Sequence, residues 1–297
     1  MLRSLYSGVS GMKGFQTKLD TIGNNIANVN TYGFKQGRVT FQDMMSQTMS
    51  NAQGPIENGS GGNVTGGLNA SQVGLGTQIG SIDTIHTQGN RQSTGRPLDL
   101  ALEGDGMFVL AEAGTAGVNV QGGNTDLSQL QISFTRAGNF YLDDAGDLVN
   151  NSGKYVMGAE GAITIPDDAQ SFNIQTDGTV NYIDANNVVQ KAGQIMLANF
   201  SNPGGLEKIG GNEYRATPNS GLLSADGTED GLNSLDDLSI AGQNGTGGMI
   251  AGALEMSNVD LADQFTEMIT SQRGFQANTK IITTSDEILQ ELVNLKR

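Results

Sequence analysis

The 297-residue sequence contains no cysteine, no tryptophan and a single histidine, His86. Without cysteine the chain cannot form disulfides, cysteine-based zinc sites or a thiol nucleophile. Basic residues are few, since 16 Lys and Arg stand against 31 Asp and Glu. We expect no nucleic-acid partner, because phosphate contacts need many Lys and Arg side chains. The longest apolar run covers residues 107–111, far too short for a membrane-spanning helix, so we expect no membrane insertion.

Residues for catalysis or metal binding are equally scarce. A Ser-His-Asp triad would need His86, which lies in an alternating stretch typical of a strand and is expected to be a surface or half-buried residue. The acidic stretches at residues 143–147 and 226–231 do not match the calcium-loop pattern and are expected to be β-turns. We therefore expect no catalytic residue, no cofactor and no metal site, although any two of the 31 acids could form a glycosidase-type carboxylate pair.

The first thirty residues do not form a standard signal peptide. Arg3, Lys13, Lys18 and Asp20 interrupt the apolar residues, so no continuous hydrophobic region is present. This composition predicts a cytoplasmic protein, or one exported by a route that does not read such a signal.

Both ends of the chain show the periodicity of long helices. Apolar residues recur at seven-residue spacing, and the expected assembly positions are Leu5, Met12, Leu19, Ile26, Leu261, Met268, Phe275, Ile282, Leu289 and Leu292. Three residues after the C-terminal apolar row comes a small or polar row, and Asp260 is placed to cap a helix of roughly 35 residues. The N-terminal helix contains four glycines, at residues 8, 11, 14 and 23, which lower its intrinsic stability by about 1 kcal/mol each relative to Ala. Such a helix needs a partner, either the other helix of the same chain or a neighbouring subunit.

The middle of the chain predicts β structure. Nine of residues 51–80 are glycine, which favours loop or extended chain. From residue 96 to residue 200, short alternating stretches are separated by Gly, Asn and Asp, as in an antiparallel sandwich or barrel-like domain. We predict an α+β fold with long N- and C-terminal helices in a coiled-coil-like layer and a central all-β domain. The expected domains are a helical one (1–30 plus 258–297), an extended linker (31–90) and a β-rich outer domain (91–257) with an insertion at 113–130.

Six stretches in this order resemble the bacterial flagellar rod and hook protein family. They are SLYSGVSG (4–11), IGNNIANVNTYGFK (22–35), PLDLALEGDG (97–106), FTRAGNF (134–140), LEMSNVDL (254–261) and QRGFQAN (272–278). The motif residues that we take as candidate site residues are Asn24, Asn25, Ala27, Asn28, Gly33, Phe34, Gly104, Asp105, Gly106, Ser257, Asn258 and Arg273. Met107 departs from the family, which usually has a second Phe there.

The resemblance implies a structural protein rather than an enzyme. Family members polymerise into a helical tube in which the terminal helices form an inner coiled-coil layer and the β domain an outer layer. The implied partners are other copies of the chain, the neighbouring rod, hook-cap and hook–filament junction proteins, and the flagellar type III export apparatus. The implied location is the extracellular flagellum, in the hook and basal body, reached without a cleaved signal peptide.

Within the family, residues 289–297 look like the end of a hook protein. We therefore predict a hook subunit, which transmits motor torque through a hollow flexible tube and passes exported subunits. The alternative is a distal rod subunit, a rigid drive shaft. Two remoter alternatives are a wall-cutting enzyme and a soluble binding module whose helices pair only within the monomer.

Overall fold

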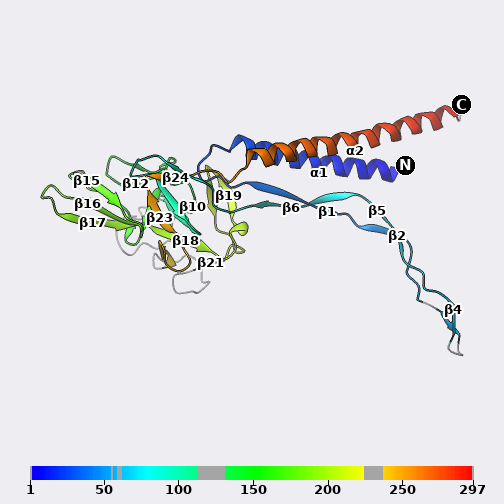
Figure 1. Ribbon diagram of the computed structural model, residues 1–297, viewed down its shortest axis with the longest axis horizontal. Helices are drawn as coiled ribbons and strands as arrows, with labels where there is room; N and C mark the ends of the chain where they lie inside the picture. Colours follow the sequence, from blue (N-terminus) through cyan, green and yellow to red (C-terminus); the bar gives the residue numbers. More distant parts are fainter. Residues whose placement is uncertain (1, 55, 59–61, 113–130, 224–236, 296–297) are drawn as a thin grey trace. The chain divides into compact units, whose positions relative to one another are not determined.

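The computed structural model describes residues 2–54, 56–58, 62–112, 131–223 and 237–295. The first and last elements of the chain are helices and the elements between them are mainly antiparallel strands, which confirms the predicted α+β class (Figure 1). The insertion at 113–130 and the acidic stretch at 226–231 lie outside the described residues.

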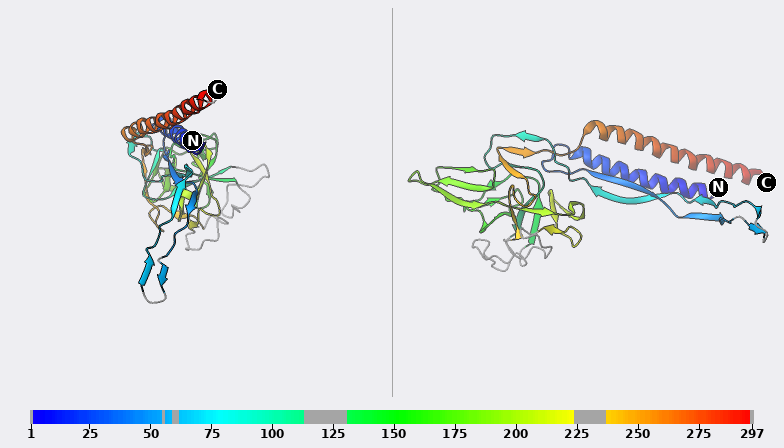
Figure 2. Two further views of the ribbon diagram at one scale, coloured as in Figure 1. Left: turned by 90° about the vertical axis from the view of Figure 1, so that its right-hand side faces the viewer. Right: turned by 60° about the horizontal axis from the view of Figure 1, so that its bottom comes forward.

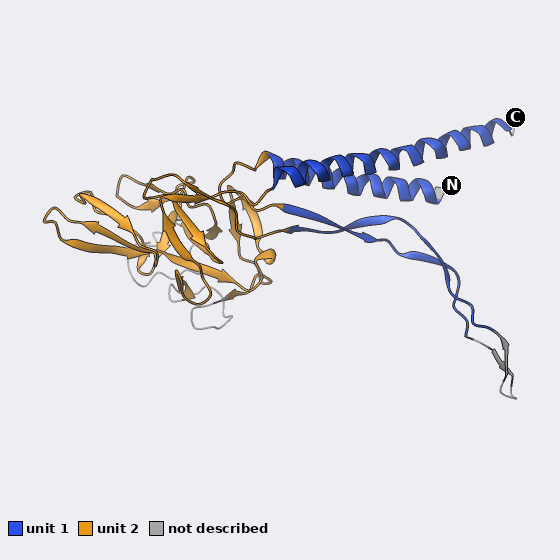
Figure 3. Ribbon diagram, in the orientation of Figure 1, with its two compact units in different colours: residues 1–26, 37–83, 260–297 blue, residues 27–36, 84–259 orange. Residues whose placement is uncertain are grey.

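The chain divides into two compact units (Figure 3). The helical unit comprises Met1–Ile26, Gly37–Asp83 and Asp260–Arg297. The β unit comprises Ala27–Gln36 and Thr84–Val259. The three domains expected from the sequence are units of folding, which these contacts do not test, so that division stays a prediction.

The helical unit contains α1 (Leu2–Ala27) and α2 (Leu261–Leu295), which lie side by side (Figure 2). The helices are antiparallel, because contacts move toward the start of α2 as they move along α1. Lys18 Nζ lies 3.5 Å from Glu267 Oε2, and the Asn25 side chain donates to Gln264 Oε1 over 3.0 Å. Neither helix carries an apolar stretch that could span a lipid bilayer.

Asp260 caps α2, as its position before the first apolar residue of the heptad row predicts. Its carboxylate accepts the backbone N–H of Ala262 at 2.8 Å and of Asp263 at 3.5 Å. These bonds satisfy two of the four N–H groups that the first turn of a helix leaves unpaired. α2 then runs for 35 residues, the length expected from the sequence.

Three of the glycines lie where the helices and their neighbours approach closely. A Cβ on Gly11 would lie 2.9 Å from Asn278 Nδ2, and one on Gly274 would lie 2.6 Å from the ring of Phe15. A Cβ on Gly8 would lie 3.2 Å from Ile282. The glycines therefore allow the two helices to pack closely, which compensates for their low helix propensity.

Gly23 differs from these positions, since a Cβ there would meet no atom within 4 Å. We expect Gly23→Ala to raise the free energy of unfolding by about 0.5–1 kcal/mol, because Ala is the better helix former and nothing opposes the methyl group. Gly11→Val should instead destabilise the helix pair. Urea unfolding followed by far-UV circular dichroism measures both variants, and a stabilising Gly11→Val would contradict the assigned packing.

The described segments within residues 37–84 contain three pairs of strands, so the extended chain that the sequence favoured for residues 51–80 is paired there. β1 (Gly37–Asp43) pairs with β6 (Thr77–Thr84), β2 (Ser46–Ser50) with β5 (Ser71–Gly74), and β3 (Ile56–Asn58) with β4 (Gly62–Thr65). Backbone hydrogen bonds hold such a ribbon together, so hydrophobic patterning does not reveal it. β1 packs on α1 through Phe41, whose ring centroid is 5.6 Å from that of Phe15.

The β unit contains the remaining strands. In chain order they are β7 (Arg91–Ser93), β8 (Leu100–Glu103), β9 (Met107–Glu112), β10 (Gln131–Thr135), β11 (Tyr141–Leu142), β12 (Leu148–Val149), β13 (Tyr155–Gly158), β14 (Gly161–Ala162), β15 (Ser171–Ile174), β16 (Thr179–Ile183), β17 (Val189–Gln194), β18 (Met196–Phe200), β19 (Glu207–Gly210), β20 (Glu213–Arg215), β21 (Leu222–Leu223), β22 (Ser239–Ile240), β23 (Gly248–Ala251) and β24 (Ala253–Glu255), with a 3₁₀ turn at Pro203–Gly205.

The strand β9 is the centre of this unit. It pairs antiparallel with β10, β13 and β18, so it is covered along both edges. Phe108 and Leu110 belong to one buried cluster, and Met107, Val109 and Ala111 belong to another. Because side chains alternate along a strand, β9 separates two apolar cores, one on each face of its sheet.

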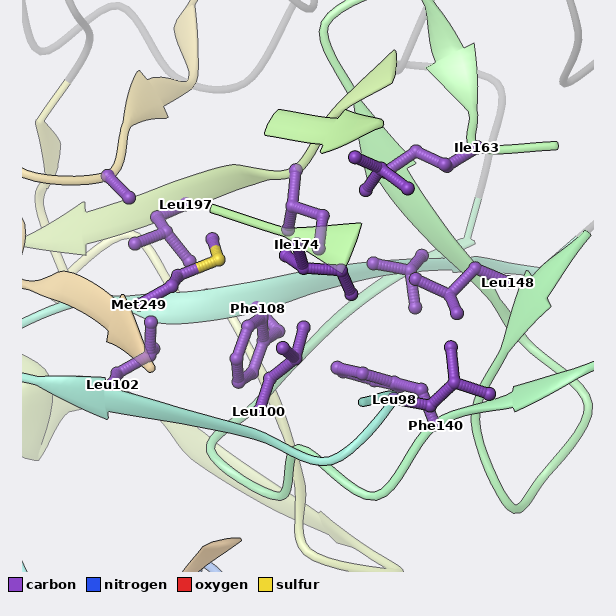
Figure 4. Packing of buried hydrophobic residues seen from close by; sticks show 14 of the residues in the cluster. Leu98, Leu100, Leu102, Phe108, Phe140, Leu148, Ile163, Ile174, Leu197 and Met249 are labelled. Carbon is purple, nitrogen blue, oxygen red and sulfur yellow. The ribbon is translucent and has the colours of Figure 1, made fainter. Parts of the chain in front are cut away.

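The first of these cores is the larger. Leu98, Leu100 and Leu102 pack with Phe108, Leu197 and Met249 (Figure 4). The rings of Phe108 and Phe140 meet edge to face with centroids 5.1 Å apart. This core holds β8 and β9 in place around the turn at residues 104–106, where the charged groups described next converge.

Candidate functional site

Segments from three sequence motifs meet within the β unit. Residues 27–36 run against residues 253–258, since Gly33 N–H donates to the Glu255 carbonyl at 2.8 Å. Gly33 has φ of 68°, and a Cβ there would lie 2.6 Å from the backbone nitrogen of Ala137. Only glycine tolerates both the left-handed backbone and this close approach. Gly33 therefore links the N-terminal motif to the central one.

Three charged side chains form the centre of this junction, which we call the charged triad: Lys35, Arg136 and Glu255. Lys35 Nζ lies 2.6 Å from Glu255 Oε1, and Arg136 Nε lies 2.6 Å from Glu255 Oε2. Their side chains are 2%, 7% and 0% exposed, respectively. Charges buried to this degree are stable only when they are paired and fully hydrogen-bonded.

The backbone around the triad completes its hydrogen bonding. Glu255 Oε1 also accepts the N–H of Gly89 at 2.9 Å, and Lys35 Nζ donates to the Thr87 carbonyl at 2.7 Å. The two terminal nitrogens of Arg136 donate to the carbonyls of Gly104 and Gly106. Both glycines have positive φ, 118° and 125°, which the turn uses to direct these carbonyls toward the guanidinium.

The electrostatics keep Glu255 ionised. Burial alone raises the pKa of a carboxyl group, but the attraction of Arg136 and Lys35 outweighs it, so the pKa of Glu255 lies below its ordinary value. Burial lowers the pKa of Lys35, and the attraction of Glu255 opposes that shift. The triad is therefore one coupled group of two cations around one anion.

His86 lies near this triad but is neutral. Burial, and then the positive charges of Lys35, Lys208 and Arg136, lower its pKa to about 4. Its Nδ1 is buried and has no hydrogen-bond partner in the described structure, and its ring lies 5.5 Å from that of Tyr214. His86 is half-buried, as the sequence predicted, but it follows β6 and is not part of a strand.

The pKa of His86 makes a pH prediction. Because the pKa of His86 is lower in the folded state, its neutral ring contributes fully to the stability of the fold above the ordinary pKa of 6.5. The unfolded chain takes up the proton first, so this contribution is lost as the pH falls from 6.5 toward 4. We expect the free energy of unfolding of the wild type to fall over this range, and that of His86→Phe to fall less. Urea unfolding at several pH values between 7 and 4 measures the difference, and identical slopes for the two proteins would contradict the burial of a neutral His86.

The remaining motif residues divide between the two units. Asn258 bridges three segments of the β unit, since its Oδ1 accepts Gln36 N–H at 2.8 Å and its Nδ2 donates to the Ile85 carbonyl at 2.8 Å. Ser257 is buried and accepts the N–H of Val259, and Phe34 is buried beneath Lys208. Asn28 is half-buried. Asp105 is exposed, and the backbone carbonyl of Asp105 accepts Gly247 N–H.

In the helical unit, Asn25 connects α1 to two other elements. Its Nδ2 donates to the Gly37 carbonyl at 2.9 Å and to Gln264, and its Oδ1 accepts Gly37 N–H at 2.9 Å. The amide therefore ties α1 to the start of β1 and to α2. Two other motif residues of this unit, Asn24 and Arg273, have exposed side chains, as does Ala27 at the start of the β unit.

The polar and apolar heptad rows of α2 differ in how deeply they are buried. Gln264, Ser271 and Ser285 of the polar row are buried against the rest of the helical unit. The apolar row is half-buried at Met268, Phe275, Ile282 and Leu289, as are Leu5, Met12, Leu19 and Ile26 of α1. Leu261 and Leu292 are 40% and 49% exposed. The assembly role of these residues stays a prediction.

Sequence reasoning did not single out the charged triad. All three residues lie inside the quoted motifs, yet none was chosen as a site residue. The available signal was a charge within an otherwise apolar or glycine-rich stretch, as Glu255 is between Leu254 and Met256. Among the described residues, no group of three acidic or histidine side chains could hold a metal ion.

Comparison with known families agrees with the motifs. Residues 5–35 match the family described as "Flagella basal body rod protein", residues 101–182 match "Flagellar hook protein FlgE/F/G D1 domain", and residues 250–295 match "Flagellar basal body rod FlgEFG protein C-terminal". These ranges contain all three triad residues. They also cover most of α1, all of α2 and the central strand β9.

Individual relatives match over the whole chain. The flagellar basal-body rod protein FlgG of Bacillus subtilis is 54% identical over 299 residues, covering 100% of both chains. FlgG of Caulobacter vibrioides is 36% identical over 297 residues, covering 99% of this chain and 100% of the relative. The flagellar hook protein FlgE of Borreliella burgdorferi is 32% identical over 460 residues, covering 100% of both. The chain belongs to the flagellar rod and hook protein family of structural proteins.

Proposed function

We propose that this protein is a distal rod subunit of the bacterial flagellum. The observation that carries the proposal is the 54% identity with a basal-body rod protein over the full length of both chains. The hook protein of Borreliella burgdorferi needs a 460-residue alignment with this 297-residue chain and reaches 32% identity. The last residues of the chain predicted a hook subunit, and these comparisons support the alternative, a distal rod subunit, better.

In this proposal the subunit polymerises through its helical unit. Large apolar side chains are exposed there, including Tyr6 at 73%, Phe265 at 50%, Ile269 at 60% and Leu295 at 83%. Phe265 and Ile269 are neighbours one turn apart on α2, and contiguous exposed apolar surface marks a site that another molecule covers. Neighbouring copies would bury them in a tube wall, with the β unit forming the outer layer.

The β unit supports the mechanical role. Torque passes from one subunit to the next only if each unit resists deformation. Two apolar cores around β9 and the fully paired charged triad provide that resistance, because close-packed interiors transmit strain. The resulting rod is a straight drive shaft rather than a flexible joint.

The proposed location is the flagellar basal body, outside the cytoplasm. The subunit would leave the cell through the flagellar type III export apparatus without a cleaved signal peptide. Its partners would be other copies of itself, the adjacent rod proteins and, beyond its distal end, the hook. The sequence predicted hook-cap and hook–filament junction partners together with the hook assignment, and the rod proposal does not include them.

Complementation in Bacillus subtilis tests the proposal. The gene for this protein is expressed in a strain that lacks its own FlgG and in a strain that lacks its hook protein. We expect swimming and hook-bearing basal bodies in the first strain and neither in the second. Rescue of the hook-deficient strain alone would overturn the rod assignment.

A further inference from the structure

A polar pocket of about 230 Å³ lies in the β unit, separate from the charged triad. Most of its walls are turns: residues 30–32 after α1, the turn between β12 and β13, and the turn between β19 and β20. The end of β10 and the segment that follows it complete the lining. All of its lining residues are uncharged, and most are Asn, Thr, Ser or Tyr.

The walls are fixed by hydrogen bonds of their own. Asn150 Oδ1 accepts the N–H groups of Ser152 and Lys154 at 2.8 and 2.9 Å, and its Nδ2 donates to Glu213. Asn212 Nδ2 donates to the Tyr32 carbonyl at 2.9 Å. A pocket whose walls are already ordered binds a ligand without the entropic cost of ordering them.

Four other side chains of the pocket are half-buried or exposed, and none of them bonds to another described protein group. Among the described residues, no hydrogen bond involves the side-chain amides of Asn30, Asn139 and Asn151 or the hydroxyl of Tyr32. Each amide offers two donors and an acceptor, and the hydroxyl offers one donor and an acceptor. An apolar ligand would leave these groups unpaired, which is costly. An anion would find no cation in the lining, and a cation would find no carboxylate.

We propose that this pocket binds a neutral saccharide unit, with an N-acetylated sugar preferred. Sugar hydroxyls are donors and acceptors at once, as the three free amides are. The N–H of an acetamido group can donate to the Asn side-chain oxygen, and its carbonyl can accept from the Asn side-chain NH₂. Tyr32, a half-buried residue of the lining, adds a phenol hydroxyl as a further donor and acceptor. A peptide fits less well, because extended peptides add to strand edges and most of these walls are turns.

The proposal is independent of the rod assignment, and side-chain amide NMR tests it on the full-length chain. Titration with tri-N-acetylglucosamine is expected to shift the Asn30, Asn139 and Asn151 amide signals, and maltotriose should shift them at higher concentration only. Asn139→Ala and Tyr32→Phe should each weaken binding about tenfold, the effect of one lost hydrogen bond.

Asn173→Ala is the matched control, because Asn173 is an exposed asparagine on β15 outside the pocket. It should bind the sugar as the wild type does. Unchanged amide signals at millimolar sugar would overturn the proposal. So would shifts that grow with protein concentration in the absence of sugar, since the pocket would then hold a second copy of the chain.

Discussion

Replacing Glu255 by Gln is expected to lower the free energy of unfolding by about 3–5 kcal/mol, the cost typical of breaking a buried ion pair. The substitution keeps the size of the side chain but leaves Lys35 and Arg136 buried without a compensating charge. Domains are usually stable by only about 5–15 kcal/mol, so a loss of this size threatens folding of the whole β unit. Urea unfolding monitored by tyrosine fluorescence measures it, since the chain has six Tyr and no Trp.

Glu207→Gln is the matched control. Its carboxylate also lies 2.6 Å from a guanidinium nitrogen, that of Arg215, but both side chains are more than half exposed. Water and mobile ions screen such a pair, so we expect a change of about 0–1 kcal/mol. Equal effects of the two substitutions would show that burial does not govern the triad and would contradict its assigned role.

Acid should act on the triad in the same direction as Glu255→Gln. A carboxyl group whose pKa is lowered in the folded state stabilises fully above its ordinary pKa of 4.5 and loses that contribution as the pH falls through the folded value. The wild type should therefore lose stability below about 4.5, and Glu255→Gln should lose less. Unfolding curves at pH 4.5 and below measure this difference.

Replacing Ile282 by Asp is expected to abolish swimming and to leave cells without complete rods. Ile282 is half-buried and packs where Gly8 allows α1 to approach, with 3.2 Å between its Cγ1 and the Cβ position of Gly8. A carboxylate there would lose hydration against an apolar surface and weaken the helix pair. The β unit should stay folded, because its cores contain no residue of α2.

Thr283→Asp controls for added charge on the same turn of α2. Thr283 is exposed, and its side-chain hydrogen bond is to the Lys280 carbonyl of its own helix. Cells carrying this variant should swim normally. If cells with Ile282→Asp swim, the pairing of α1 with α2 is not required for assembly and this prediction is wrong.

The elements that could be predicted from sequence are those with strong periodicity or local signals. α2 has an apolar heptad row and a capping Asp260 at its start, so its length and first residue follow. β9 begins with a five-residue apolar run that follows a Gly-Asp-Gly turn, and this pattern indicates a buried strand. In both cases the information lies within a few residues of the element itself.

The ribbon and the charged triad could not be predicted, because their information is not local. β2 and β5 have exposed side chains throughout, so their pairing depends on backbone hydrogen bonds between distant segments. Lys35 and Glu255 are 220 residues apart in sequence, and neither differs by type from an ordinary surface charge. Only the fold shows that both are buried.

The glycines of α1 show how composition can mislead. Their low helix propensity predicts a helix that needs a partner, but it does not say why they are there. The positions of Gly8 and Gly11 against α2 give the reason, since larger side chains would hold the helices apart.

The most direct test of the rod assignment is immunogold electron microscopy of isolated hook–basal bodies. An epitope tag in the exposed turn at residues 185–187, between β16 and β17, marks the subunit, with swimming as the control for normal assembly. We expect gold on the straight shaft below the hook. Gold along the curved extracellular hook would contradict it and restore the flexible-joint assignment.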